Sequence, residues 1–126
     1  MVDAVAAPLQ RTPLHAQHVA LGAKMVPFGG WDMPVQYTSL MAEHQAVRHS
    51  AGLLDRSHAG KLEVLGRDRV RFLHAMLTND LKRLAPGQGC DAAFLDHHGK
   101  VQALLHVYGL EDRLLLTLPP GLVEKT

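Results

Sequence analysis

Three apolar segments near the C-terminal end of the sequence, joined by short polar connections, constrain the fold more than any other feature. They comprise residues 90–95, 101–108 and 114–118. Gly99 lies in the first connection and can supply the positive φ that a tight hairpin turn needs. We therefore expect residues 92–96 to pair antiparallel with residues 100–108, and residues 113–118 to lie beside this second strand.

The second and third segments carry apolar residues at both alternating sets of positions. Strands with this pattern are covered on both faces of their sheet. The sequence therefore predicts an α+β fold, an antiparallel meander sheet with helices packed on one face. The other face would be covered by a ligand, another domain or a partner.

Two helices are predicted in the first half of the chain. The first begins at Thr12-Pro13, because threonine is a good N-cap and proline suits the first helical position. The second begins at Ser39 and ends at Ala51-Gly52, where the glycine suits a left-handed cap. The residues that share a face of the first helix are Leu14, His18 and Leu21, and those that point inward from the second are Leu40, Ala46 and Val47.

The remaining elements follow from local patterns. Residues 29–37 are interpreted as an extended loop in which Trp31, the only tryptophan, is buried. Residues 61–65 alternate polar and apolar and predict a strand. Asp68 is expected to cap a third helix, which ends at Thr78-Asn79-Asp80. The inward-facing residues are Leu62 and Val64 in the strand and Val70, Leu73 and Leu77 in the helix.

Length and composition favour one ordinary globular domain over residues 1–126, with residues 1–12 as a disordered leader. Hydrophobic residues make up 47% and charged residues 20% of the 126 residues. The net charge of +1 gives no basic surface for nucleic acid or for an anionic membrane. The single cysteine, Cys90, fits a reducing compartment, and no signal peptide or membrane span is predicted. The sequence therefore favours a cytoplasmic location.

Few residues suggest chemistry by their spacing alone. No glycine-rich phosphate loop, paired-cysteine metal site or nucleophile elbow is present. The pairs His15 and His18, and His97 and His98, lack a complete metal ligand set and are interpreted as exposed histidines. Cys90 has no adjacent base and is interpreted as a small core residue. A basic cluster is interpreted as a solvated helix face in preference to a groove for an anionic ligand; its members are Arg67, Arg69, Arg71, Lys82 and Arg83.

The stretch GWDMPVQY at residues 30–37 is the most specific motif of the chain. Together with Ser57-His58 and Leu77-Thr78-Asn79-Asp80, it resembles the N-terminal part of the glycine cleavage T-protein, a tetrahydrofolate-dependent aminomethyltransferase. Later segments resemble the related YgfZ-type folate-binding proteins, which assist iron–sulfur protein maturation. These segments are residues 71–74, 86–90 and 99–101.

The resemblance implies a folate-binding fold built from several lobes around a channel, of which this chain is a partial domain, the first lobe. It places folate-contacting positions at Ala59, Asp91, Leu104 and His106. In T-proteins two adjacent aspartates follow the hairpin glycines, and the second assists proton transfer on folate. Because the corresponding residues here are Ala103 and Leu104, the resemblance implies no catalytic residue in this chain.

Three functions remain open from the resemblance. The first is transfer of a methylene group from a lipoyl-bearing aminomethyl carrier protein to tetrahydrofolate, with release of ammonia. The second is a nonenzymatic folate-dependent maturation factor of the YgfZ type, and the third is a structural remnant. The sequence favours a tetrahydrofolate-binding protein that is not catalytic as this piece. Self-association is also expected, because the last strand would have an unpaired edge and four leucines would be uncovered, namely Leu104, Leu114, Leu116 and Leu118.

Overall fold

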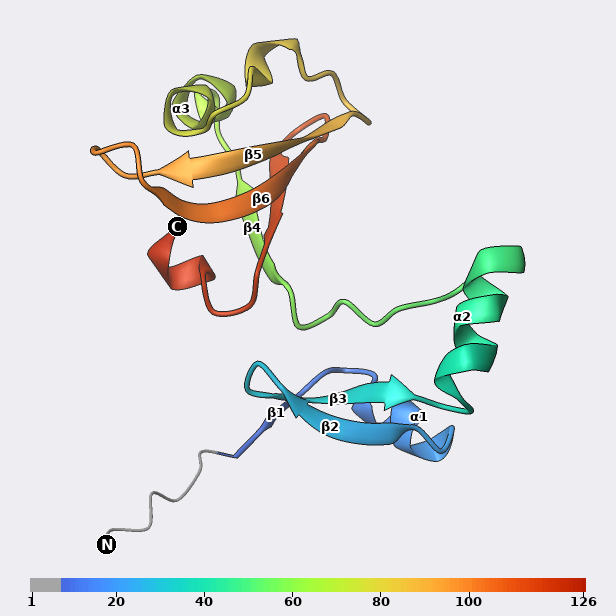
Figure 1. The fold of residues 1–126 in the computed structure, drawn as a ribbon. Coiled ribbons are helices and arrows are strands. Elements are labelled where there is room, and N and C mark those ends of the chain that lie inside the picture. Colours follow the sequence, from blue (N-terminus) through green and yellow to red (C-terminus); the bar gives the residue numbers. More distant parts are fainter. Residues whose placement is uncertain (1–7) are drawn as a thin grey trace, which may run out of the picture. The chain divides into compact units, whose positions relative to one another are not determined.

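The computed structural model describes residues 8–126, which belong to two compact units, residues 1–58 and residues 59–126. Each unit has its own sheet (Figure 1). Most of the expected leader, residues 1–7, lies outside the described residues. Its last part is not a leader, because Gln10–Arg11 form the short strand β1 and Thr12 is buried. In the described range, no helix is both long enough and apolar enough to cross a membrane.

The first unit contains a three-stranded sheet in the order β1-β3-β2. Strands β2 (Lys24–Phe28) and β3 (Trp31–Gln36) form an antiparallel hairpin, and β1 pairs with β3 in parallel. The expected extended loop over residues 29–37 is therefore wrong. Gly29 and Gly30 both have positive φ, which allows a two-residue turn between the strands. The expected burial of Trp31 is found only in part, since its side chain remains partly exposed.

The two helices of the first unit are α1 (His15–Ala20) and α2 (Leu40–His49). The cap of α1 is Leu14 and no side chain caps it, so the predicted cap at Thr12 is wrong. The predicted cap of α2 is confirmed, because Ser39 Oγ accepts a hydrogen bond from the Ala42 N–H at 3.2 Å. Helix α2 ends at His49 with Ser50 as its C-cap, and Gly52 is not in the left-handed region, so the predicted glycine cap is wrong.

No residue of α2 is buried. Leu40 and Val47, which were expected to point into a core, are both exposed. The predicted helix is confirmed, but the described residues of the first unit place no layer over its apolar side. The prediction of an inward face for this helix is therefore wrong.

The second unit is built on a four-stranded antiparallel sheet in the order β4-β7-β6-β5. The strands are β4 (Gly60–Val64), β5 (Gly89–Leu95), β6 (Val101–Gly109) and β7 (Leu114–Leu118). The predicted meander is confirmed, with β6 paired to both β5 and β7. Gly99 has the positive φ expected at the turn before β6. The predicted free edge of β7 is wrong, because β4 pairs along it.

One face of this sheet forms the core of the second unit. It is covered by α3 (Arg69–Met76) and the short 3-10 helix η1 (Leu81–Arg83) (Figure 1). The last 3-10 helix, η2 (Val123–Lys125), also contributes to this core through its first residue and the residue before it. The fully buried side chains are Leu81, Val107 and Leu116. The predicted buried stripe is confirmed at Leu73 of α3, and Leu77, the residue after the helix, lies in the same core.

The leucines that were expected to be uncovered are mostly inside this core. Leu114, Leu116 and Leu118 are buried against the helices, and only Leu104 is exposed. The reason is the alternation of the strands, since Leu104 points to the opposite face from Leu105. The surface that was expected to drive self-association is therefore much smaller than predicted.

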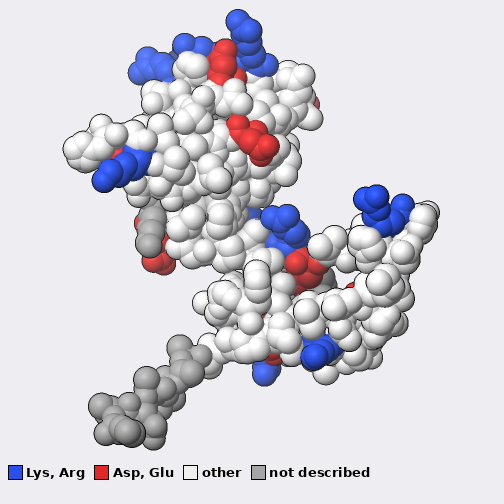
Figure 2. Space-filling view, viewed as in Figure 1, with Lys and Arg blue, Asp and Glu red and all other residues white. Residues whose placement is uncertain are grey.

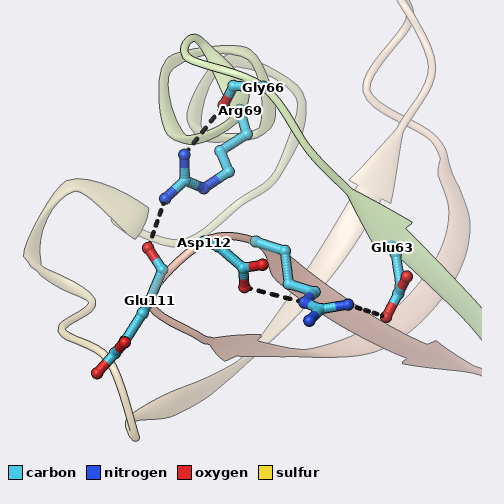
Figure 3. Close-up of polar contacts among 6 residues, drawn as sticks. Glu63, Gly66, Arg69, Glu111 and Asp112 are labelled. Atoms are coloured by element: carbon cyan, nitrogen blue, oxygen red, sulfur yellow. Dashed lines mark hydrogen bonds and ion pairs between the residues drawn. The ribbon is translucent and has the colours of Figure 1, made fainter.

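Two arginines connect elements at the rim of the second unit (Figure 3). Arg69, at the start of α3, donates to the backbone oxygens of Gly66 and Glu111, each at 3.0 Å. Arg113 donates to Asp112 at 3.0 Å and to Glu63 of β4 at 3.1 Å. These bonds fasten the turn between β6 and β7 to α3 on one side and to β4 on the other.

Candidate functional site

The helices of residues 59–126 pack on the core face, so within the described part of this unit no helix covers the second face, which we call the open face. By strand alternation its residues include Lys61, Glu63, Asp91, Ala93, Leu104, His106, Tyr108, Leu115 and Thr117. Leu104 is 66% exposed although it is apolar and central on β6. A single exposed apolar side chain is ordinary on a protein surface, so the open face is a candidate site because of the polar groups that surround Leu104.

Asp91 of β5 and His106 of β6 are directly opposite each other in the strand register. The Asp91 carboxylate lies 2.8 Å from His106 Nδ1. Because a carboxylate only accepts, Nδ1 carries the proton and donates, which leaves Nε2 of a neutral His106 as an acceptor. The Asp91 side chain is 93% exposed, so its second oxygen is open to solvent.

Two neighbours shape the space around the ring of His106. The ring of Tyr108 lies beside it with a centroid separation of 4.4 Å. Gly89 leaves room for it on the neighbouring strand, since a Cβ at that position would lie 2.5 Å from His106 Nε2. The open face thus offers a carboxylate, an imidazole and a phenol ring beside an apolar side chain. Such a surface can hold a flat ring with hydrogen-bond donors at its edge.

Three of the four sequence-predicted positions are brought together here. Asp91, Leu104 and His106 share the open face, whereas Ala59 directly precedes β4, two strands away from β6. Leu104 places no acid on this face. Ala103, the other substituted position, is 2% exposed and points into the core. A proton-transferring group at position 103 would therefore not reach the open face.

A second polar group, in the first unit, was missed by the sequence reasoning. His18 was interpreted as exposed, but it is buried, and its Nε2 lies 2.9 Å from Asp55 Oδ2. Its Nδ1 lies 2.7 Å from the hydroxyl of Tyr37. The position of His18 on the same helical face as Leu14 and Leu21 gave no valid signal of burial, because both leucines are exposed. Its partner Asp55 gave none, because the two residues are far apart in sequence.

Asp55 is the most strongly perturbed acid of the described residues. Burial would raise its pKa, but hydrogen bonds from Ser57 and His18 outweigh this effect and hold the pKa of Asp55 well below its usual value. The carboxylate is therefore ionised under all ordinary conditions. His18 donates a hydrogen bond to Asp55 through Nε2, so its Nδ1 accepts a hydrogen bond from the Tyr37 hydroxyl.

An open hollow of about 370 Å³ lies in the first unit next to this group. Its walls are mostly apolar, with the polar residues Tyr37, Glu43, Asp55, Arg56 and His58 among them. Hydrogen bonds from the backbone of Thr38 and Tyr37 lower the pKa of Glu43. His58 lies edge-on to the rings of Phe28 and Trp31. Most of the carboxylate oxygens in the hollow are thus already engaged by the protein.

The other candidates from the sequence do not form sites. Cys90 packs against the core, and burial, followed by the charge of Asp91, raises the pKa of its thiol, so that it stays protonated. The rings of His97 and His98 lie next to each other at the hairpin tip, with their planes tilted by 44°. Over residues 8–126, no group of three or more His, Cys, Asp or Glu side chains could hold a metal ion.

Basic side chains gather on the second unit over α3 and η1 (Figure 2). Within this cluster Arg69 is held by backbone oxygens, and Arg83 lies 3.3 Å from Asp80. Arg83 is 89% exposed. A surface of this kind agrees with the solvated helix face expected from the sequence.

Comparisons with known proteins agree on the family. Residues 14–124 match the family described as GCVT N-terminal domain. The aminomethyltransferase of Deinococcus deserti is 53% identical over 118 residues, covering 93% of this chain and 33% of that protein. The aminomethyltransferase of Desulforamulus reducens is 48% identical over 108 residues, covering 86% of this chain and 30% of that protein.

A solved structure is similar in fold. The crystal structure of glycine cleavage system aminomethyltransferase T from Bartonella henselae has a TM-score of 0.86 and 33% sequence identity, covering 93% of this chain and 33% of that one. This chain thus spans about a third of the length of the relatives that it matches. From the family match, the identities and the shared fold, the chain belongs to the aminomethyltransferase (glycine cleavage T-protein) family and corresponds to its N-terminal domain.

Proposed function

We propose that this chain is the partial folate-binding domain of an aminomethyltransferase-family protein, and that its open face forms one wall of a tetrahydrofolate site. The observation that carries the proposal is the shared placement of Asp91, Leu104 and His106 on one exposed sheet face. All three are positions that the family resemblance relates to folate.

The chemistry of the open face fits a pterin ring. The exposed oxygen of Asp91 can accept hydrogen bonds from ring nitrogens, and Leu104 and Tyr108 supply apolar surface for the ring. Because a single sheet face cannot enclose a ligand, we expect binding by these 126 residues to be weaker than about 1 μM.

This chain does not itself supply the acid of an aminomethyl transfer. Leu104 occupies the position where the resemblance implies a proton-transferring carboxylate, and a leucine neither donates nor accepts a proton. A positioned acid or base contributes about 10²–10⁴-fold to rate. As further parts of the proposal, the lipoyl-bearing carrier protein would be its partner and the cytoplasm its location.

Titration with tetrahydrofolate, followed by amide NMR shifts, tests the binding proposal. We expect shifts at Asp91, Leu104 and His106, and weaker binding in Leu104→Ala. Leu110→Ala is the matched control, because Leu110 is also exposed but lies in the turn after β6. Shifts confined to other residues, or no shift at millimolar tetrahydrofolate, would overturn the proposal.

A chimera tests the missing acid. The matching 118 residues of the Deinococcus deserti aminomethyltransferase are replaced by those of this chain. We expect aminomethyl transfer to fall about 10²–10⁴-fold, and Leu104→Asp to restore part of it. Ala103→Asp serves as the control that should restore nothing, because Ala103 faces the core. Full activity in the unmodified chimera would show that Leu104 is not the position of the acid.

The substitution at Leu104 also favours a second candidate, a nonenzymatic folate-binding protein of the YgfZ type. That function needs the open face as a wall of the tetrahydrofolate site, but it needs no group that transfers a proton. The two experiments together distinguish it. Folate shifts on the open face, combined with a chimera that Leu104→Asp does not rescue, would support the nonenzymatic protein.

A further inference from the structure

The segment that follows α3 runs along the edge of β5 that is not paired with β6. Leu77 forms an isolated antiparallel bridge with Phe94. The Thr78 N–H donates to the Ala93 oxygen at 3.1 Å, and the Ala93 N–H donates to Thr78 Oγ1 at 2.9 Å. Asn79 Nδ2 donates to the backbone oxygen of Asp91 at 3.0 Å. The side chains of Thr78 and Asn79 thus bond to the outer edge of β5, where a further strand would otherwise pair.

These bonds hold β5 at Asp91 itself and two residues further along the strand, at Ala93. Asn79 fixes the carbonyl of Asp91 itself, and Thr78 fixes both backbone groups of Ala93. Asn79 is in turn oriented by its own Oδ1, which accepts from the Asp80 N–H at 2.8 Å. The position of the Asp91 backbone is therefore determined from the outer edge of β5 as well as by β6.

The contact between Asp91 and His106 needs such support. The Asp91 side chain is 93% exposed, and an exposed ion pair does not hold its own geometry against solvent. In the strand, the side chain of Asp91 points to the open face, where it contacts His106. Its backbone carbonyl points along the sheet to the outer edge, where it accepts from Asn79. A shift of this edge backbone would move the carboxylate away from His106 Nδ1.

We propose that Thr78 and Asn79 are positioning residues for the open face. They hold β5 so that the Asp91 carboxylate meets His106, which fixes the neutral ring with its proton on Nδ1 and with Nε2 as an acceptor. The positioning itself needs no ligand. Its relevance to folate rests on the function proposed above.

The test measures which nitrogen of His106 carries the proton, by ¹⁵N NMR of the ligand-free chain at a pH about two units above the ordinary histidine pKa. Thr78→Val removes the hydroxyl at nearly constant volume, and Asn79→Asp removes the Nδ2 donor. In both variants we expect the Nδ1–H fraction to fall about twofold, the scale of an exposed hydrogen-bonded pair. Thr78→Ser, which keeps the hydroxyl, should retain the fraction of the unmodified chain.

Core amide signals of Val107 and Leu116 show whether each variant is folded. A merely structural role would lower stability without changing the proton position in the folded molecules. Thr38→Val, an exposed threonine of the first unit, is the matched control. Should Thr78→Val fail to fold, Asn79→Asp decides, since it removes one exposed hydrogen bond. An unchanged Nδ1–H fraction in the folded variants would overturn the proposal.

Addition of tetrahydrofolate separates this proposal from the function. A changed proton position in the variants, with no folate shift in any protein, would keep the positioning role and reject the folate site. Folate shifts in every protein, with an unchanged proton position, would keep the site and reject the positioning role. If both proposals hold, Thr78→Val and Asn79→Asp also weaken the folate shifts at Asp91, whereas Thr78→Ser does not.

Discussion

Both units contain histidine–aspartate contacts, and the two that differ most in their surroundings are one buried pair in the first unit and one exposed pair in the second. His18 and Asp55 are 2.9 Å apart with side chains 8% and 2% exposed, whereas His106 and Asp91 are 2.8 Å apart with side chains 34% and 93% exposed. The distances are nearly equal, so distance does not distinguish the pairs. The buried pair therefore supports the fold of its unit, while the exposed pair is free to meet a ligand.

The largest effect is expected from removing the buried acid. Asp55→Ala leaves His18 buried without its partner and should lower the free energy of unfolding of the first unit by about 2–4 kcal/mol. Urea unfolding followed by the fluorescence of Trp31, the only tryptophan, reports on this unit. Asp91→Ala is the matched control in the second unit and should leave that transition unchanged. Equal effects of the two variants would contradict the comparison.

The next largest effect is expected from lowering the pH, which should destabilise the first unit through Asp55. The folded-state pKa of Asp55 is lowered, so the unfolded chain binds the proton at higher pH. The resulting stability of the first unit is fully present above pH ~4, the usual aspartate pKa, and is lost as the pH falls below it. Trp31 fluorescence during urea unfolding between pH 7 and 3 measures this loss. Asp55→Asn should lack this part of the pH dependence. If the free energy of unfolding changed with pH by the same slope in both proteins, the contribution of Asp55 would be excluded.

A smaller effect is expected from filling the space beside the exposed pair. In Gly89→Ala the new Cβ would approach His106 Nε2 to 2.5 Å and the Val107 oxygen to 3.0 Å. Because the imidazole can rotate away, we expect a loss of about 1 kcal/mol in the second unit. The contact with Asp91 should be lost as well, seen as a changed proton position on His106. A retained contact would show that the ring has more room than the strand spacing suggests.

The smallest effect on stability is expected from Asp91→Asn. An exposed ion pair contributes about 0–1 kcal/mol, so hydrogen exchange of the β6 amides should change little. The folate shifts on the open face should nevertheless disappear, because the accepting carboxylate is gone. A destabilisation above about 2 kcal/mol would mean that this pair resembles the buried one.

The fold of the second unit was largely predictable because its signals are local. Three apolar segments and Gly99 gave the meander directly, and the alternation along β6 gave the placement of its side chains. The pairing of β4 with β7 was not predictable from these signals, since no short turn joins the two strands. In the first unit, Pro27 and Pro34 interrupt the alternation of β2 and β3, which hid the hairpin.

The candidate site was predictable only in part. Asp91, Leu104 and His106 came from the family resemblance, and their common face follows from the register between β5 and β6. The group of His18, Tyr37 and Asp55 depends on contacts between three separate segments. A single sequence contains no periodic pattern that would report such contacts, so burial of His18 could be seen only in the structure.

The pairing of β4 with β7 also has a consequence for the order of folding. Strands β5, β6 and β7 follow one another through short turns, so they can assemble with little loss of chain entropy. β4 must close a much longer loop, as shown by the contact between Glu63 and Arg113, 50 residues apart. We therefore expect β4 to dock after the meander has formed, with its arginine contact made late and little developed in the folding transition state.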